Sequence, residues 1–353
     1  MVKGKKVDSP KPRSVEPHAV AVLIDAINAT HQGLGALAAI SYIAAKARQT
    51  AMVIGPPGTG KSAVARWLEK TLPEAYLRGD LTMAGLRKYC DELSNSEAAI
   101  VIDDLGECNS EWNRAQTCIA ISALVYGHDM IKDTHQIKVE ILNYFGSGWI
   151  GCQPAILAEV VKHPSFHANL RDKSLRYYHL VRPVVANFGP IAVPAEWGMP
   201  LNDMLPIEDF PPEWDALMTI GRIEWSYARA QEHMEALLKA CAALDGRYSV
   251  DATDYAVLLP LVRPMTVEQH IIEKEGFDSA ATLNQNLLCL LAEFASYPAV
   301  TYEIIGGDYG IRPRKVQSIL EDMNQWYYKV QNSPVVLVPT EDLKAVLEDA
   351  GIR

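Results

Sequence analysis

Residues 55–62 contain the glycines and side chains that a phosphate-binding loop requires. Glycines allow backbone N–H groups to converge on phosphate oxygens because no Cβ stands in the way. A lysine in such a loop places its charge on the β- and γ-phosphates of a nucleotide, and the serine after it ligates Mg²⁺. The sequence therefore predicts that ATP and Mg²⁺ bind at Gly55, Pro56, Pro57, Gly58, Thr59, Gly60, Lys61 and Ser62.

Two adjacent carboxylates, Asp103 and Asp104, directly follow an apolar run at residues 98–102. Asp103 at the end of a strand is suited to hold Mg²⁺ opposite Ser62, usually through a water molecule. Asp104 is suited to orient and deprotonate the water that attacks the γ-phosphate. Glu107 is a second candidate for this base, since Asp104 is a methylene shorter than the glutamate that many such ATPases carry.

The surrounding sequence predicts the elements that would hold these residues at one edge of a sheet. Strands are expected at residues 50–54, 75–77 and 98–102, because short apolar runs fit strands that are buried on both faces. Helices are expected at residues 62–72 and 83–93. Strands that alternate with helices indicate an α/β fold with a doubly wound parallel sheet.

Composition limits the range of functions. The chain has 353 residues and a formal net charge of −10, which argues against bulk non-specific binding of nucleic acid but not against a local basic surface. No apolar run reaches the roughly 18 to 20 residues of a membrane span, so a cytoplasmic protein without a membrane partner is expected. The six cysteines form no C-x-x-C or zinc spacing, and we interpret them as buried apolar side chains.

The loop and the acidic strand end resemble those of the AAA+ ATPases. Residues 55–62 match the form of the phosphate loop that this family prefers, and "VIDDLGE" at residues 101–107 resembles the Walker B segment of its initiator and helicase-loader members. The resemblance implies a polar sensor 1 residue at the tip of the next strand, with Gln153 as the candidate and Asn143 as the alternative. Residues 131–148 are expected to form a β-hairpin, which resembles the pre-sensor-1 hairpin of the MoxR-type and minichromosome maintenance branch.

Two arginines are further candidates that this resemblance implies. A short basic loop resembles the one that delivers an arginine finger to the γ-phosphate of a neighbouring subunit, and Arg171 is preferred to Arg176 in this role. Arg229 would be the sensor 2 arginine, which binds the nucleotide from a lid whose helices are expected at residues 214–230 and 233–244. An arginine finger implies a homo-oligomer, and the family suggests a hexameric ring.

The last part of the chain indicates a winged helix-turn-helix, because helices are followed by two strands at residues 327–338. The expected recognition helix begins with basic and polar side chains, and a lysine lies on the wing. Residues 282–353 carry six Lys or Arg and nine Asp or Glu, and this net charge of −3 weakens attraction to DNA. DNA contact and docking of a protein partner therefore both stay open. The candidates for DNA contact are Arg312, Arg314, Lys315, Gln317 and Lys329.

The expected organisation has a disordered basic tail at residues 1–17, an AAA+ α/β ATPase domain at 18–183, a proline-rich linker at 184–212, an all-α lid at 213–278 and a winged-helix domain at 279–353. The preferred function is a ring-forming ATPase, a motor or switch that acts on DNA in replication initiation, helicase action, helicase loading or a mobile-element process. One alternative is a MoxR-type ATPase that remodels a protein partner, with the winged helix as its adaptor. Another is a slow or non-hydrolysing nucleotide switch, because Asp104 replaces the usual glutamate.

Overall fold

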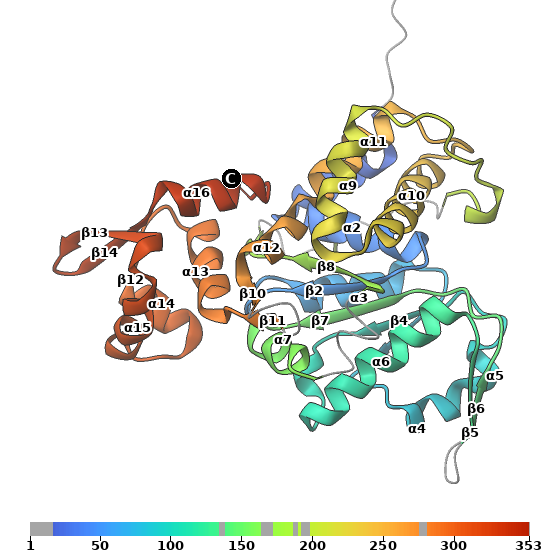
Figure 1. Cartoon of the computed structure of the whole chain (residues 1–353), viewed down its shortest axis with the longest axis horizontal. Helices are drawn as coiled ribbons and strands as arrows, with labels where there is room; N and C mark the ends of the chain where they lie inside the picture. Colours follow the sequence, from blue (N-terminus) through green and yellow to red (C-terminus); the bar gives the residue numbers. More distant parts are fainter. Residues whose placement is uncertain are drawn as a thin grey trace, which may run out of the picture.

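A five-stranded parallel sheet with helices on both faces forms the centre of the molecule, which confirms the expected α/β architecture (Figure 1). The structure, a computed structural model, describes residues 17–133, 138–163, 172–185, 190–191, 198–274 and 281–352. Across the sheet the strand order is β3-β4-β7-β2-β8. The strands are β2 (Thr50–Ile54), β3 (Ala75–Arg78), β4 (Ala99–Ile102), β7 (Gly148–Cys152) and β8 (Ser174–Tyr178).

Alternate residues of the central strands face two different hydrophobic cores. In β2, the side chains at positions 52 and 54 pack in one core with α6 (Glu111–Gly127) and α7 (Pro154–Val161). Those at positions 51 and 53 pack in the other core with α1 (Ala19–Asn28), α2 (Gly35–Lys46) and α3 (Lys61–Thr71). Burial on both faces explains why these strands read as continuous apolar runs in the sequence.

The segment 83–93 does not form the single helix that was expected. Tyr89 has φ −117° and ψ 13°, which lies outside the helical region and divides the segment. Leu86 and Leu93 are both buried, so the two ends pack into the core although the helix between them is broken. The pieces are α4 (Met83–Leu86), the 3-10 turn η1 (Arg87–Tyr89) and α5 (Cys90–Leu93).

The expected helix at 214–230 is also wrong, because the chain leaves helical geometry at Trp225. This residue is extended, and its buried indole Nε1 donates a hydrogen bond of 3.1 Å to the backbone oxygen of Ser174. A tertiary contact therefore overrides a continuous helical pattern. The two helices that result are α9 (Pro212–Glu224) and α10 (Tyr227–Leu244), and α10 includes the expected helix at 233–244.

Helices α9 and α10 pack with α11 (Ala252–Val262) against α2 and share its core. Figure 1 shows this helical group on one side of the sheet. The chain continues through η4 (Arg263–Thr266) and α12 (Val267–Ile271) to a pair of antiparallel strands, β10 (Ile272–Lys274) and β11 (Ala281–Leu283).

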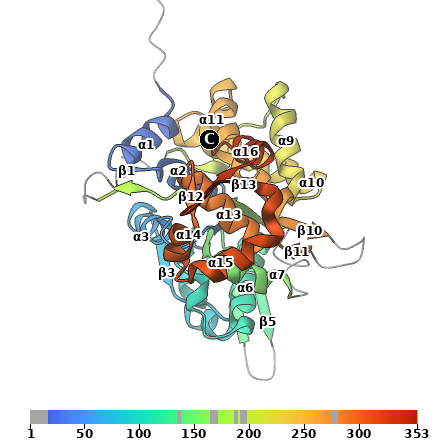
Figure 2. The same cartoon turned by 90° about the vertical axis from the view of Figure 1, so that its left-hand side faces the viewer.

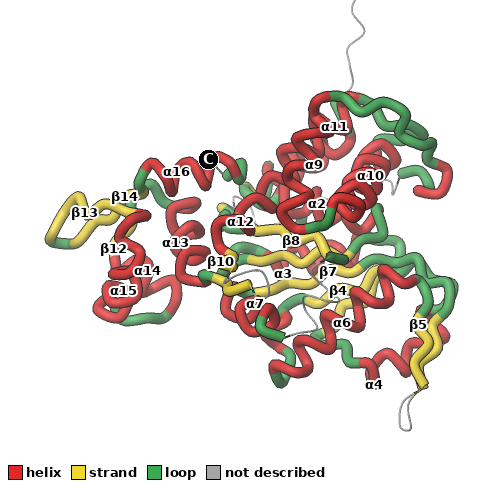
Figure 3. Tube along the Cα trace, in the orientation of Figure 1, coloured by secondary structure: helices red, strands yellow, loops and turns green. Residues whose placement is uncertain are grey.

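The hairpin expected at residues 131–148 is confirmed in its described part. Strand β5 (Met130–Asp133) pairs antiparallel with β6 (Lys138–Ile141), and both lie between α6 and β7 in the chain. The hairpin projects from the sheet domain (Figure 3). Of the proline-rich segment, the described residues include β9 (Val184–Val185), which pairs with β1 (His31–Gln32), and the 3-10 turn η3 (Leu201–Asp203). Residues 1–16 of the expected tail lie outside the described residues.

Residues 285–352 form what we call the C-terminal block, which lies beside the sheet domain (Figures 1 and 2). A hairpin near residues 327–338 was expected and is confirmed, and a third short strand completes a sheet in the order β12-β14-β13. The core of the block is continuous with the core of α6 and α7. In chain order the block contains α13 (Gln285–Ser296), β12 (Val300–Thr301), α14 (Tyr302–Tyr309), α15 (Pro313–Leu320), η5 (Glu321–Trp326), β13 (Tyr327–Asn332), β14 (Val335–Pro339) and α16 (Glu341–Asp349).

Candidate active site

The glycine-rich loop lies between β2 and α3, at what we call the carboxyl edge, the edge of the sheet where its parallel strands end. The backbone N–H of Gly55 donates to the oxygen of Cys152 at 3.1 Å. A Cβ on Gly55 would lie only 2.3 Å from the carbonyl oxygen of His179, so no larger residue fits there. Gly58 and Gly60 have φ of +78° and +84°, a region that favours glycine. The loop therefore depends on its glycines for its path.

Lys61, the first residue of α3, is buried within the loop. Its Nζ donates to the carbonyl oxygens of Gly55 at 2.7 Å and Pro56 at 2.9 Å. Burial lowers the pKa of Lys61, while the nearby carboxylates of Asp104 and Asp103 act to raise it. The ammonium group is thus held at the loop by carbonyl oxygens that phosphate oxygens would have to replace.

Asp103 follows β4 at the carboxyl edge, and its Oδ1 is buried without a hydrogen-bond partner among the described residues. Its Oδ2 lies 3.9 Å from Nη2 of Arg66, an exposed residue of α3. Ser62 is exposed near the start of the same helix. A buried carboxylate oxygen without a hydrogen-bond partner is a suitable ligand for a Mg²⁺ ion or for a water bound to it, so Asp103 and Ser62 are the residues that could hold Mg²⁺ together with phosphate oxygens.

The structure brings Gln153 to Asp104. Gln153 follows β7, and its Nε2 donates to Oδ2 of Asp104 at 2.8 Å, while Oδ1 of Asp104 accepts from the backbone N–H of Gly106 at 2.8 Å. The alternative sensor, Asn143, precedes β7 and therefore lies at the opposite end of that strand, where its Nδ2 donates to Oδ1 of Asn95 at 3.1 Å. Of the two candidates, Gln153 is therefore the one that lies beside Asp104.

Glu107, the alternative base, ends the 3-10 turn η2 (Leu105–Glu107) and is exposed. Its Oε2 lies near Gly79, and the residue lines a polar hollow together with Arg78 and Lys88. Asp104, not Glu107, is the carboxylate that contacts Gln153.

His179 is a residue of this site that sequence reasoning missed. It directly follows β8, and its backbone N–H donates to the oxygen of Ile54 at 2.7 Å. The ring is buried, bonds the backbone of Thr59, and has an Nε2 without a partner among the described residues. Burial and, to a smaller extent, the nearby charge of Lys61 lower the pKa of His179 to about 4, although the bond to the backbone of Thr59 acts to raise it. No motif marks a lone histidine, so only the pairing of β8 with β2 could reveal it.

Arg229 does not reach the glycine-rich loop of its own chain, contrary to the expected sensor 2 position. Its Nη1 lies 2.6 Å from Glu232 and its Nε 3.5 Å from Asp172, and its guanidinium lies 4.2 Å from the ring centroid of Tyr126. Asp172 precedes β8 and Tyr126 lies near the end of α6, so Arg229 is at the amino-terminal edge of the sheet. The preferred arginine finger, Arg171, lies outside the described residues.

Arg176, the alternative finger, cannot contact a neighbouring subunit because it is fully buried in β8. Its Nε lies 2.9 Å from both carboxylate oxygens of Glu268, and its Nη2 lies 2.7 Å from Oε1. Its backbone N–H donates to Glu224 of α9 at 2.9 Å. This cluster joins β8 to α9 and α12, so Arg176 serves the fold.

The candidate DNA-contact residues are on the surface of the C-terminal block. Arg312 is the residue before α15, and Val316 and Leu320 are the buried positions of that helix. The wing candidate is in the edge strand β13. All of the candidates are exposed, namely Arg312, Arg314, Lys315, Gln317 and Lys329.

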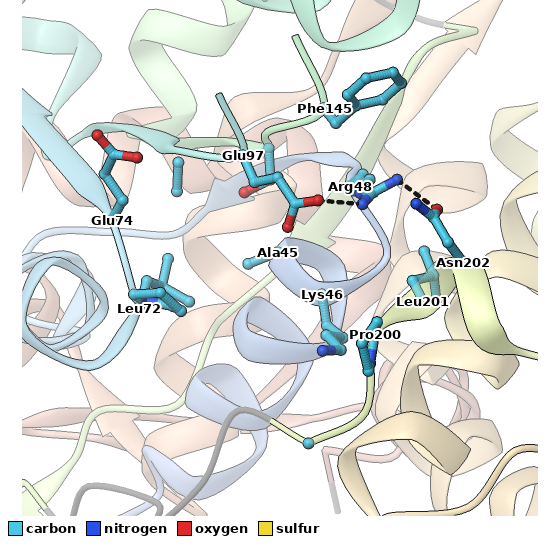
Figure 4. Close-up of a pocket in the computed structure, with 14 residues that line it drawn as sticks. Ala45, Lys46, Arg48, Leu72, Glu74, Glu97, Phe145, Pro200, Leu201 and Asn202 are labelled. Carbon is cyan, nitrogen blue, oxygen red and sulfur yellow. Dashed lines mark hydrogen bonds and ion pairs between the residues drawn. The ribbon is translucent and has the colours of Figure 1, made fainter. Parts of the chain in front are cut away.

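A separate hollow of about 330 Å³ opens near the amino-terminal edge (Figure 4). Arg48 lies in its wall and is bonded to Glu97 at 2.6 Å and to Asn202 at 3.0 Å. Arg48 precedes β2 and Glu97 precedes β4, so the hollow and the glycine-rich loop are at opposite ends of these strands. The two sites are therefore distinct.

Comparison with known proteins adds no family. No protein-family model matches the chain, and no curated protein matches it. Among the described helices, none is long and apolar enough to cross a membrane. Function is therefore argued from the geometry of the site.

Proposed function

We propose that the chain is an ATPase of the AAA+ type that uses Mg²⁺, assembles into a ring and acts on DNA. The observation that carries this proposal is the meeting of the glycine-rich loop, Asp103, Asp104 and Gln153 at one edge of the sheet. Open α/β sheets bind ligands outside the carboxyl ends of their strands, which is where these residues lie.

Each residue has a role that its position supports. Backbone N–H groups of the loop and the start of α3 bind the phosphates, and Lys61 exchanges two loop carbonyls for phosphate oxygens. Ser62 and Asp103 hold Mg²⁺, which would neutralise the charge on the phosphates. Asp104 orients the attacking water, and Gln153 positions Asp104 and reports on the γ-phosphate.

The position of Arg229 supports the proposed homo-oligomer. This arginine is at the opposite edge from its own glycine-rich loop, next to Asp172, and Arg171 directly precedes Asp172 in the sequence. In this proposal, Arg229 acts on a γ-phosphate only if a second copy presents its carboxyl edge to it. A repeated head-to-tail contact closes into a ring when its rotation divides a full turn, and we propose such a ring, with a hexamer as the expected size.

In this proposal α9 to α11 correspond to the lid, and the C-terminal block corresponds to a winged helix. The order of two helices and a hairpin, with exposed basic residues where α15 begins, supports DNA as the partner. One observation favours a protein partner instead: Tyr328 and Val330 in the edge strand β13 are 56% and 60% exposed. Exposed apolar side chains on an edge strand suit docking of another chain.

Nucleotide binding tests the central proposal. Lys61→Ala should weaken the binding of a fluorescent ATP analogue by about tenfold or more, which is about 1.4 kcal/mol, and should abolish hydrolysis. Lys70→Ala is the matched control, because Lys70 is an exposed lysine in the last turn of the same helix. Equal affinity and turnover in the parent and in Lys61→Ala would refute the assignment of the loop.

DNA-stimulated turnover separates the two partner classes. Duplex DNA should raise the hydrolysis rate if the C-terminal block binds it, and binding to DNA should weaken as salt increases. If the protein hydrolyses ATP at a rate that DNA does not change, the result would favour remodelling of a protein partner. A protein that binds ATP without measurable turnover would be a nucleotide switch.

A further inference from the structure

One arginine of the sheet domain forms ion pairs with two helices of the C-terminal block, in addition to the shared hydrophobic core. Arg182 follows β8 by four residues, at the carboxyl edge. Its Nη2 lies 2.9 Å from Oε1 of Glu293 in α13, and its Nη1 lies 3.4 Å from Oε2 of the same carboxylate. Nη1 also lies 2.8 Å from Oδ2 of Asp308 in α14. Two helices of the block are thus held by one guanidinium.

The contact is substantially desolvated. Glu293 is 0% exposed, and the side chains of Arg182 and Asp308 are 18% and 32% exposed. Burial raises the pKa of Glu293, and hydrogen bonding to Arg182 opposes this rise. The guanidinium also lies 6.0 Å from the ring centroid of Tyr297. Breaking the contact would leave a buried carboxylate without its cation, which is costly.

The neighbouring residue, Pro183, lies next to the glycine-rich loop. Cγ of Pro183 lies 3.3 Å from the position that a Cβ on Gly60 would take. Gly60 is the residue before α3, and Lys61 follows it directly. Strand β9, which begins immediately after Pro183, is held by pairing with β1. Arg182 therefore binds the C-terminal block, and the next residue, Pro183, lies beside the phosphate-binding loop.

We propose that Arg182 couples the occupant of the glycine-rich loop to the position of the C-terminal block. This inference rests on the proposed binding of a nucleoside triphosphate. When phosphates draw Lys61 away from the oxygens of Gly55 and Pro56, the packing of Gly60 on Pro183 changes, and Arg182 transmits the change to α13 and α14. Such coupling is reciprocal, so loosening the block must change nucleotide affinity by the same free energy.

The test measures affinity and backbone exchange together in the full chain. Arg182→Ala should change the Kd for a fluorescent ADP or ATP analogue by about fivefold or more, the lower bound of ordinary coupling. In the parent, nucleotide should alter hydrogen–deuterium exchange in α13 and α14, and in Arg182→Ala this response should disappear. Asp308→Asn is the milder variant, because Glu293 keeps its cation and the fold is preserved; it should change the Kd in the same direction by a smaller factor.

Arg247→Ala is the matched control for a general loss of stability. Arg247 also contacts several acids, with Nη2 at 2.7 Å from Asp254 and Nε at 2.9 Å from Asp245, but it lies between α10 and α11. Arg247→Ala should leave the Kd for nucleotide and the hydrogen–deuterium exchange response of α13 and α14 as in the parent. An unchanged Kd in folded Arg182→Ala and Asp308→Asn would overturn the coupling while the proposed function stands. A parent that binds no nucleotide would overturn both.

Discussion

Nε2 of Gln153 lies 2.8 Å from Oδ2 of Asp104, so the tips of β7 and β4 are joined by a hydrogen bond at the carboxyl edge. The other carboxylate oxygen of Asp104 accepts from Gly106, and both oxygens are therefore engaged. A water that attacks the γ-phosphate would have to share or replace one of these contacts. Of the two partners of Asp104, the side-chain amide of Gln153 can rotate away, whereas the N–H of Gly106 is fixed because it belongs to the backbone.

Substitution of Asp104 should stop hydrolysis while leaving nucleotide binding intact. Asp104→Asn removes the proton acceptor and should lower the turnover rate by about 100-fold, within the range that general base catalysis contributes. Steady-state phosphate release and binding of a fluorescent ATP analogue measure the two effects separately. Glu107→Gln is the control and should keep the parent rate. An inactive Glu107→Gln beside an active Asp104→Asn would reverse the assignment.

Activity should be restored when two inactive variants are mixed. Arg171→Ala keeps an intact glycine-rich loop, and Lys61→Ala keeps its arginine, so a neighbour of one kind can complete the site of the other. Equal amounts that mix at random place this combination at about a quarter of head-to-tail interfaces. Phosphate release from the mixture, compared with each variant alone, measures the rescue. Mixed oligomers without any gain in turnover would contradict a role across the subunit boundary.

Removing the partner of Arg176 should destabilise the fold. Glu268→Ala leaves a fully buried guanidinium without the carboxylate that binds it, and should reduce the free energy of unfolding by about 3–5 kcal/mol. Glu232→Ala is the matched control, because it removes an exposed partner of Arg229 and should cost less than about 1 kcal/mol. Chemical denaturation compares the three proteins. If both variants lost a similar free energy of unfolding, the buried pair of Arg176 and Glu268 would contribute no more to stability than an exposed pair.

Acid should destabilise the protein through His179. The pKa of this histidine is about 4 when folded, against an ordinary value of 6.5, so its neutral form is favoured in the native state. The unfolded chain takes up the proton first as pH falls below 6.5, and stability is lost from there down to about pH 4. Between about pH 7 and pH 5 this histidine should account for about 2 kcal/mol. The loss should be absent in His179→Asn, as measured by denaturation at each pH, and an equal acid loss in both proteins would show that other groups cause it.

The salt dependence of DNA binding should report on the start of α15. Three phosphate contacts give a slope of about −2.7 for log affinity against log salt concentration. Replacing both Arg312 and Arg314 by alanine should flatten this slope by about 1.8 while turnover without DNA is unchanged. The matched control replaces Arg87 and Lys88, an exposed basic pair in η1. Fluorescence anisotropy with a labelled duplex measures the slope for each variant. An unchanged slope in the α15 variant would favour a protein partner.

Sequence alone determined the features that depend on neighbours in the chain. The strand at residues 50–54, the glycine-rich loop and the helix after it are visible because apolar runs, glycine spacing and helix starts are local patterns. The same holds for the hairpin of β5 and β6 and for the strand that ends at Asp103. The sequence also placed Gln153 and Asp104 each after a strand, and the structure then showed that the two side chains are hydrogen-bonded.

Only the tertiary structure decided the partners of Arg176, Arg229 and Arg182. Arg171 and Arg176 look alike in a basic loop, yet the pairing of β8 with β2 buries Arg176 against Glu268. Arg229 was expected at the nucleotide, but the packing of α10 places it at the amino-terminal edge beside Asp172. Long side chains take their partners from whichever elements pack beside them, and these elements are far apart in sequence. For the same physical reason no local pattern could reveal that Arg182 joins the sheet domain to Glu293 and Asp308.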